Sequence, residues 1–224
     1  MKPFAHRAEA GAILALSLAG LRETRCVVAA LPRGGVAVAL PVARALGAPL
    51  TLSFVRKLVL ARAPELAVGA IDEDGEVMTD ASTLAGLGAS LDELTEARTR
   101  AEQELARQRD AFPVTPLAAH LPDASVVLVD DGPATGLTLR AAIAYARRHG
   151  ARKVIVAVPC SSAVAARRLQ READRFICPW VNRDFLAVGR QYEDFRQVSD
   201  AHVQALLEQA RAEARPAGAR QEPG

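Results

Sequence analysis

Short apolar runs alternate with longer segments of helical spacing along most of the chain. The apolar runs have the length and branched side chains of buried parallel strands, and they cover residues 26–31, 51–55, 125–129, 153–158 and 175–178. Segments whose apolar positions recur with helical spacing cover residues 10–21, 36–46, 136–149, 161–170 and 200–212. This order predicts an α/β fold: a parallel sheet that is flanked by helices and joined by right-handed crossovers.

The pattern changes between residues 56 and 116. Residues 61–78 mix Pro64, Gly69 and Gly75 with short β-like pieces, which indicates a hairpin or a mobile flap. Residues 91–112 predict a charged helix with an apolar stripe and a Glu96–Arg100 pair, and we expect its charges to face solvent.

These patterns predict one domain over residues 1–212. It would carry a flap and helical insertion at about 56–116 and a C-terminal hood at about 176–197. The tail, residues 213–224, contains two prolines and two glycines and is expected to be disordered.

Length, charge and cysteine content exclude several classes of protein. The 224 residues are 50% hydrophobic, and 28 basic against 26 acidic side chains give a net charge of +2, which argues against binding nucleic acid by bulk electrostatics. The longest apolar run, residues 10–21, is too short to cross a membrane. Cys26, Cys160 and Cys178 fit neither a zinc site nor a disulfide framework, so we expect free thiols in a reducing cytoplasm.

The segment from Val126 to Thr138 carries the clearest chemistry. A hydrophobic strand delivers Asp130 and Asp131 to its carboxyl end, where ligands bind in open α/β sheets. A loop of small and hydroxyl residues follows and leads into a helix, whose first N–H groups suit a phosphate. Carboxylates would repel that phosphate, so we expect them to accept hydrogen bonds from vicinal sugar hydroxyls, directly or through a divalent cation. The alternative is a capping aspartate before an ordinary helix.

Three further cations are candidates for the same ligand. Arg33 lies between Pro32 and a glycine pair, which lets the backbone approach an anion while the guanidinium bridges two of its oxygens. Arg56 and Lys57 follow the second predicted strand at its carboxyl end. The alternatives are a simple turn arginine and a solvated pair.

Other catalytic chemistries find little support. The four histidines are scattered without metal-ligand spacing, and no serine or cysteine nucleophile accompanies them. Neither a Walker-type phosphate loop nor a Gly-x-Gly-x-x-Gly sequence occurs, which disfavours nucleotide hydrolysis by a P-loop and dinucleotide-dependent redox chemistry.

The segment Val126–Thr138 resembles the phosphoribosyl-diphosphate (PRPP) signature of the type I phosphoribosyltransferases. The resemblance extends over nearly the whole chain and is closest to a bacterial subgroup of that family. The matching segments are Arg7 with Ala10, Gly11 and Leu14, then Leu31–Gly35, Glu65–Ala70, Ala187–Phe195 and Gln197–Asp200. In relatives the loop at 31–35 often contains a cis peptide bond, expected here next to Gly34.

The resemblance implies a glycosyltransferase of nucleotide metabolism. Such an enzyme transfers ribose 5-phosphate from PRPP to a nitrogenous, nucleobase-like acceptor and releases pyrophosphate, with Mg²⁺ as cofactor. The catalytic residues would be Asp130, Asp131, Arg33 and Lys57, with the two aspartates contacting Mg²⁺ indirectly. Residues expected to bind the 5′-phosphate are Gly132, Pro133, Ala134, Thr135, Gly136, Leu137 and Thr138. Those expected at the pyrophosphate are Arg33, Gly34, Gly35, Arg56 and Lys57.

The acceptor stays open at this level. Relatives that act on 6-oxopurines have an acidic base at the position of Ala134, which cannot move a proton, so purine, pyrimidine and other acceptors are all compatible. Few aromatic residues are present, and five cluster between Phe176 and Phe195. Because relatives place base-contacting residues in the hood, Trp180, Phe185 and Tyr192 are candidates to stack on the acceptor, or else pin the C-terminal region to the core.

Two other classes of function remain as alternatives. One is a non-catalytic PRPP-binding regulator, although such proteins usually add a DNA-binding module or a strongly basic face. The other is a structural scaffold, which leaves both phosphate-type loops unexplained. We expect PRPP and a small acceptor as ligands, no nucleic acid or membrane partner, and a homodimer, as relatives commonly form.

Overall fold

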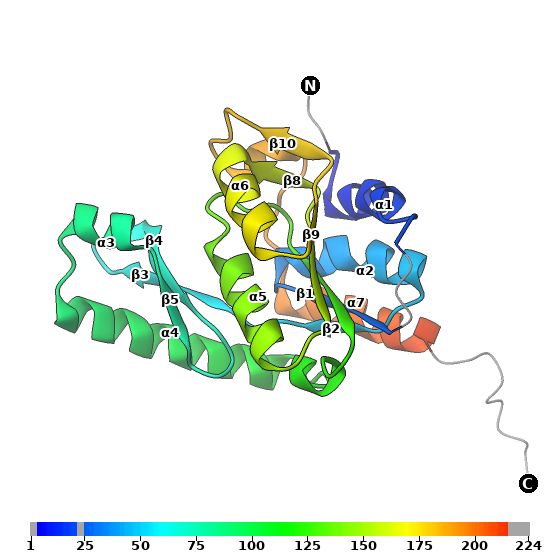
Figure 1. Cartoon of the computed structure of the whole chain (residues 1–224), viewed down its shortest axis with the longest axis horizontal. Coiled ribbons are helices and arrows are strands. Elements are labelled where there is room, and N and C mark those ends of the chain that lie inside the picture. Colours follow the sequence, from blue (N-terminus) through cyan, green and yellow to red (C-terminus); the bar gives the residue numbers. More distant parts are fainter. Residues whose placement is uncertain (1–3, 22–24, 215–224) are drawn as a thin grey trace, which may run out of the picture.

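A five-stranded parallel sheet forms the centre of the computed structural model, which describes residues 4–21 and 25–214 (Figure 1). In sheet order, its strands are β2 (Leu50–Leu52), β1 (Cys26–Ala30), β6 (Ser125–Val129), β7 (Lys153–Ala157) and β9 (Arg175–Ile177). Every neighbouring pair is parallel. The predicted α/β fold with a parallel sheet is therefore confirmed, and all five strands deliver their following loops to one edge.

Helices cover both faces of this sheet (Figure 1). One face packs against α2 (Gly34–Leu46), which in turn contacts α1 (Arg7–Ser17) and α7 (Asp200–Ala214). The other face packs against α5 (Leu137–Arg148) and α6 (Ala163–Glu172). Because successive strand residues point to opposite faces, Val28 and Ala30 join the first core, and Val27 and Ala29 join the second.

The first helix differs from the expected 10–21 at both ends. It begins at Arg7 because His6 caps it, its ring Nδ1 accepting a hydrogen bond from the Glu9 amide over 3.2 Å. It ends at Ser17, and Leu18 and Leu21 lie buried in the turn that follows. The apolar run therefore reflects burial of a helix and its exit turn, not a longer helix.

The segment that was predicted as a flap forms a second, antiparallel sheet with two helices. Its elements are β3 (Arg56–Leu60), β4 (Ala63–Ile71), β5 (Val77–Thr79), α3 (Ala81–Leu87) and α4 (Leu91–Ala111). It projects to one side of the central sheet (Figure 1). Ser90 and Glu93 form a capping box at the start of α4, and the predicted Arg100–Glu96 ion pair is present at 3.4 Å.

Short strands and 3₁₀ turns connect the main elements. Strands β8 (Cys160–Ser162) and β10 (Trp180–Asn182) form a parallel pair, and the 3₁₀ turns are η1 (Leu117–His120) and η2 (Val188–Gln191). The expected helix at 161–170 starts later, at Ala163, because Ser162 is its cap and still belongs to β8.

The last helix extends into the predicted tail. Glu213 and Ala214 are its final residues, and Glu213 forms an ion pair of 2.6 Å with Arg44, so disorder from residue 213 is wrong for these two. Residues 215–224 lie outside the described part. All three cysteines are free thiols, as expected. Among the described residues, no helix has the length and apolar character to span a bilayer.

Candidate functional site

The loops after β1 and β6 meet at the carboxyl edge of the sheet. The Leu31 amide donates a hydrogen bond of 2.9 Å to the Val129 carbonyl. A Cβ at Gly35 would come within 2.7 Å of that same carbonyl oxygen, and a Cβ at Gly34 would overlap the Asp131 carboxylate. Both glycines are therefore required by close approach of the two loops. The peptide bond between Pro32 and Arg33 is cis, one position before the expected place.

The Asp131 carboxylate is held by an arginine that is distant in the sequence. Arg7 Nε donates to Asp131 Oδ2 over 2.8 Å, and the two side chains are only 11% and 14% exposed. Arg7 Nη1 also donates to the Arg196 carbonyl at 3.0 Å, and the guanidinium lies 3.8 Å from the centre of the Phe195 ring. This pairing holds the Asp131 carboxylate in one orientation.

Asp130 is the second carboxylate of the pair, and like Asp131 it is half-buried. Burial and the negative charge of Asp131 raise its pKa to about 7, while the Asp131 amide, at 2.9 Å, and the charge of Lys57 oppose the shift. The pair therefore combines one carboxylate held by a cation with one whose ionised form would be stabilised by hydroxyl groups of a ligand or by a cation.

The loop between β6 and α5 is held from behind by β8. Ser162 Oγ donates to the Ala134 carbonyl at 2.5 Å, and the Ser162 amide donates to the Pro133 carbonyl at 3.1 Å. Gly136, with φ of 79°, is the N-cap of α5. The carbonyls of Pro133 and Ala134 are thus directed toward β8. The first N–H groups of α5 have no helical acceptors, and the Leu137 amide donates to Thr135 Oγ1 at 3.4 Å, so a helix N-terminus faces the loop. Thr135 and Ala134 are exposed at this point.

The predicted cations lie on two sides of the site. Arg33 contacts Asp200 at 3.2 Å, and Arg56 lies 3.8 Å from Glu104 of α4. Burial lowers the pKa of Arg56. Lys57, its neighbour on β3, is exposed and acts electrostatically on Asp130. Because adjacent strand residues point to opposite faces, Arg56 joins Arg33, whereas Lys57 belongs to the carboxylate side.

Comparison with known proteins decides the family. The model for the phosphoribosyl transferase domain matches residues 6–192, which include both loops of the site. The chain belongs to the phosphoribosyl transferase domain family.

Relatives of this phosphoribosyl transferase domain agree with the assignment. A Mycobacterium tuberculosis protein (strain H37Rv), provisionally named a phosphoribosyl transferase, is 42% identical over 98% of this chain. The match covers 49% of that protein, so the chain spans about half the length of this curated relative. The crystal structure of TT1426 from Thermus thermophilus superposes with a TM-score of 0.73 and 39% identity, over 93% of this chain and 99% of that one.

The aromatic residues of the C-terminal region form one cluster in this phosphoribosyl transferase domain. Tyr192 is buried, with its ring centre 5.5 Å from that of Phe4 and 5.2 Å from that of Phe195. Trp180 and Phe185 are half-buried against the same cluster. The Tyr192 hydroxyl donates to the Asp131 carbonyl at 2.5 Å. The cluster therefore pins the C-terminal region beside the carboxylates, and the stacking of these rings on an acceptor stays a prediction.

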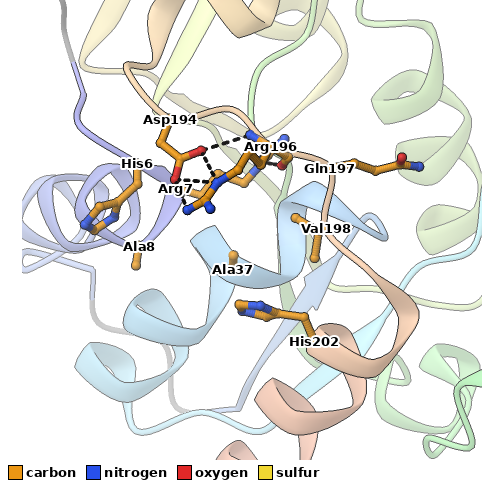
Figure 2. A pocket seen from close by; sticks show the side chains of 9 residues that line it. All are labelled: His6, Arg7, Ala8, Ala37, Asp194, Arg196, Gln197, Val198 and His202. Atoms are coloured by element: carbon orange, nitrogen blue, oxygen red, sulfur yellow. Dashed lines mark hydrogen bonds and ion pairs between the residues drawn. The ribbon is translucent and has the colours of Figure 1, made fainter.

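A cavity of about 420 Å³ lies behind Arg7 (Figure 2). His6 and Ala8 line it from the start of α1, Ala37 from α2 and His202 from α7. The lining residues from the C-terminal segment are Asp194, Arg196, Gln197 and Val198. Arg7 lines this cavity and also binds Asp131, so it connects the cavity wall to the carboxylate pair.

Three residues of the site are not identified by sequence reasoning. Arg7 belongs to a matching segment of the resemblance, but only the structure shows that it binds Asp131. Ser162 falls inside a predicted helix, yet it caps α6 and holds the phosphate-type loop. Arg107 belongs to the charged helix that was expected to face solvent; its side chain is exposed, and it also pairs with Asp200 at 3.0 Å. No local sequence signal marks these contacts, because each one joins segments distant along the chain.

Proposed function

We propose that the domain transfers ribose 5-phosphate from PRPP to a nitrogenous acceptor and releases pyrophosphate. The observation that carries this proposal is the close approach of Gly34 to the Asp131 carboxylate, which brings a diphosphate-type loop and a sugar-type carboxylate pair into one site. Membership of the phosphoribosyl transferase domain family supports the same reaction.

Each part of the site receives one part of PRPP in this proposal. The 5′-phosphate binds the loop at 132–138, through N–H groups at the start of α5 and the hydroxyls of Thr135 and Thr138. In the free domain Thr135 Oγ1 accepts a hydrogen bond of 3.4 Å from the Leu137 amide, which the phosphate would replace. Asp130 and Asp131 accept hydrogen bonds from the ribose hydroxyls. Arg33 and Lys57 stabilise the leaving diphosphate, with Gly34, Gly35 and Arg56 in support.

The carboxylate pair also fits the expected Mg²⁺. Magnesium is commonly held by one or two carboxylates together with substrate phosphates, and it keeps several waters. Asp130 and Asp131 supply two such carboxylates, and the described residues contain no cluster of three or more histidine, cysteine or acidic side chains that would hold a metal alone. When bound, the ion offsets negative charge on the leaving diphosphate.

In this reaction the protein's own contribution is to position the two substrates and to stabilise the charge that develops as the bond breaks. The bond from the anomeric carbon to the diphosphate oxygen breaks, and a bond from the acceptor nitrogen to that carbon forms with inversion. Arg7 and the loop contacts fix the carboxylates around the sugar, so the anomeric carbon is held between the diphosphate side and the acceptor side. The antiparallel insertion of residues 56–116 would close over the site and exclude water.

The acceptor in this proposal is a flat nitrogenous ring that binds beside the hood. The half-buried rings of Trp180 and Phe185 support this assignment, because each retains an exposed part. Ala134 supplies no acid or base, so the acceptor must lose its proton to another group or bind in a deprotonated form. Family membership also supports a homodimer that acts in nucleotide metabolism, and the free thiols support the cytoplasm as its compartment.

The double variant Asp130→Asn, Asp131→Asn tests the sugar site. We expect PRPP with Mg²⁺ to raise the Tm of the wild-type chain and to leave that of the double variant unchanged. Asp123→Asn is the matched control: this exposed aspartate, with φ of 56°, precedes β6, far from its carboxyl end, and asparagine tolerates that backbone conformation. Unchanged stabilisation of the double variant would overturn the assignment.

A panel of bases and amines tests the reaction itself. The expected result is magnesium-dependent release of pyrophosphate with at least one acceptor. If PRPP binds and a broad panel releases none, the non-catalytic PRPP-binding regulator becomes the better description of the domain.

A further inference from the structure

One carboxylate bridges two arginines that come from opposite ends of the site. Asp200, the first residue of α7, places Oδ1 3.2 Å from Arg33 Nη1 and Oδ2 3.0 Å from Arg107 Nη1. Arg33 belongs to the loop after β1, and Arg107 belongs to α4 of the insertion. Each oxygen of Asp200 therefore has a guanidinium of its own.

A second carboxylate extends the cluster to a third arginine. Glu104 accepts two hydrogen bonds of 2.9 Å from Arg107 and lies 3.8 Å from Arg56. The three arginines are close enough to influence one another, because the charges of Arg33 and Arg107 add to burial in lowering the pKa of Arg56, while Glu104 opposes them. Three guanidinium groups and two carboxylates leave the cluster with one net positive charge.

The cluster is open to a ligand. The side chains of Arg33, Asp200 and Arg107 are 30%, 33% and 47% exposed. Ion pairs at such exposure contribute little to stability, because solvent screens them and ordering the side chains costs entropy. Because these ion pairs stabilise the fold so little, the presence of three arginines at one place is better explained by an anion that binds there.

The geometry of Asp200 shows how that anion would bind. Two oxygens on one centre, each facing a separate guanidinium, form the arrangement that a phosphate group offers to paired arginines. A diphosphate carries more charge and more acceptor oxygens than a carboxylate does. It therefore has the advantage over Asp200 for the same guanidinium groups.

We propose that Arg107 is a third arginine of the diphosphate site and that Asp200 is an internal competitor, whose carboxylate holds the place of diphosphate oxygens until the ligand displaces it. This inference rests on the proposed function, since it takes Arg33 as a diphosphate-binding residue. It also gives a role to the Gln197–Asp200 segment and makes the insertion, through α4, part of the ligand site.

The test measures binding of inorganic pyrophosphate to the full chain by calorimetry at low ionic strength. We expect Arg107→Ala to weaken binding by about tenfold, because a charge-assisted contact is lost, and Arg107→Lys to retain part of it. We expect Asp200→Asn to strengthen binding by about three- to tenfold, because the competing charge is removed. Arg100→Ala is the matched control on α4: Arg100 pairs with Glu96 one turn away and donates to the Val59 carbonyl at 3.4 Å, without a contact to the cluster, and we expect unchanged binding.

The opposite signs of the two effects separate this inference from a structural role. If Asp200→Asn weakens binding as Arg107→Ala does, Asp200 positions the arginines and the competitor role is wrong. If Arg107→Ala binds as tightly as Arg100→Ala, Arg107 is not part of the diphosphate site. Tm values of all variants identify any loss that comes from unfolding. Failure of the wild-type chain to bind either pyrophosphate or PRPP would overturn the proposed function as well, whereas normal binding with unaffected variants overturns this inference alone.

Discussion

Arg7 Nε binds Asp131 Oδ2 at 2.8 Å, although the two residues are 124 positions apart in the sequence. The backbone of Asp131 is held as well, since its carbonyl accepts from the Tyr192 hydroxyl at 2.5 Å and from the Cys160 thiol at 3.4 Å. The candidate sugar carboxylate is thus positioned by the first helix, by β8 and by the C-terminal segment together. Its orientation is a property of the packed domain and not of its own loop.

Replacing Arg7 should damage both stability and ligand binding. Arg7→Ala leaves the mostly buried Asp131 carboxylate without its cation, which costs on the order of 2 kcal/mol or more in the free energy of unfolding. Because Asp131 then loses its fixed orientation, we expect PRPP affinity to fall by about tenfold. Chemical denaturation and calorimetry measure the two effects. Arg196→Ala is the control, because its side chain is 89% exposed and Arg7 uses only its carbonyl; equal losses in both variants would contradict the assigned role.

A methyl group at Gly34 should block the site directly. Gly34→Ala places its Cβ into the Asp131 carboxylate and within 3.1 Å of Arg7 Nε, so one of the two loops must move. We expect PRPP-dependent stabilisation to be lost. Gly86→Ala, in α3, has open space around its Cβ and should leave ligand binding unchanged. Thermal shift with and without PRPP separates the variants, and full retention of the shift by Gly34→Ala would show that ligand binding does not need the close approach of the two loops.

The parts of the fold that depend on local pattern were predictable from the sequence. Strand β6, the two aspartates and the start of α5 lie consecutively in the chain, so their order alone places carboxylates beside a helix N-terminus. The predicted start of α6 is wrong because β8 has only three residues, and its pairing with β10 is set by tertiary packing. The Arg7–Asp131 and Arg107–Asp200 contacts join distant segments, so periodicity and spacing hold no information about them.

The aromatic cluster yields a separate test of the acceptor site. Phe185→Ala removes a half-buried ring, and we expect weaker acceptor binding with little change in Tm if the ring stacks on the acceptor. Tyr192→Phe keeps the buried ring and removes only the hydroxyl that binds the Asp131 carbonyl, so we expect lower PRPP affinity with the acceptor's KM unchanged. Steady-state kinetics with each substrate varied in turn measure both. A fall in Tm for Phe185→Ala with acceptor affinity intact would favour a purely structural cluster.

The insertion carries a titrating group that should make stability fall as pH rises. Burial raises the pKa of Glu73 to about 7; Asp74 and Asp72 add to the shift, while the Phe54 amide, at 3.1 Å, and Arg109 oppose it. The unfolded chain has the ordinary value of 4.5. Between these two values the folded state binds the proton more tightly, so the free energy of unfolding decreases as pH rises through this window.

Glu73→Gln removes this titration and keeps an oxygen for the Phe54 amide. We expect the free energy of unfolding of the variant, relative to that of wild type, to increase by roughly 2 kcal/mol between pH 5 and pH 8. Each unit of pKa shift corresponds to about 1.4 kcal/mol, and the partial exposure of Glu73 reduces the full effect. Denaturant titrations at a series of pH values measure the difference between the two chains. Glu208→Gln, at an exposed position of α7, should track wild type throughout. If the difference between Glu73→Gln and wild type stays constant across this range, Glu73 does not titrate there in the folded domain.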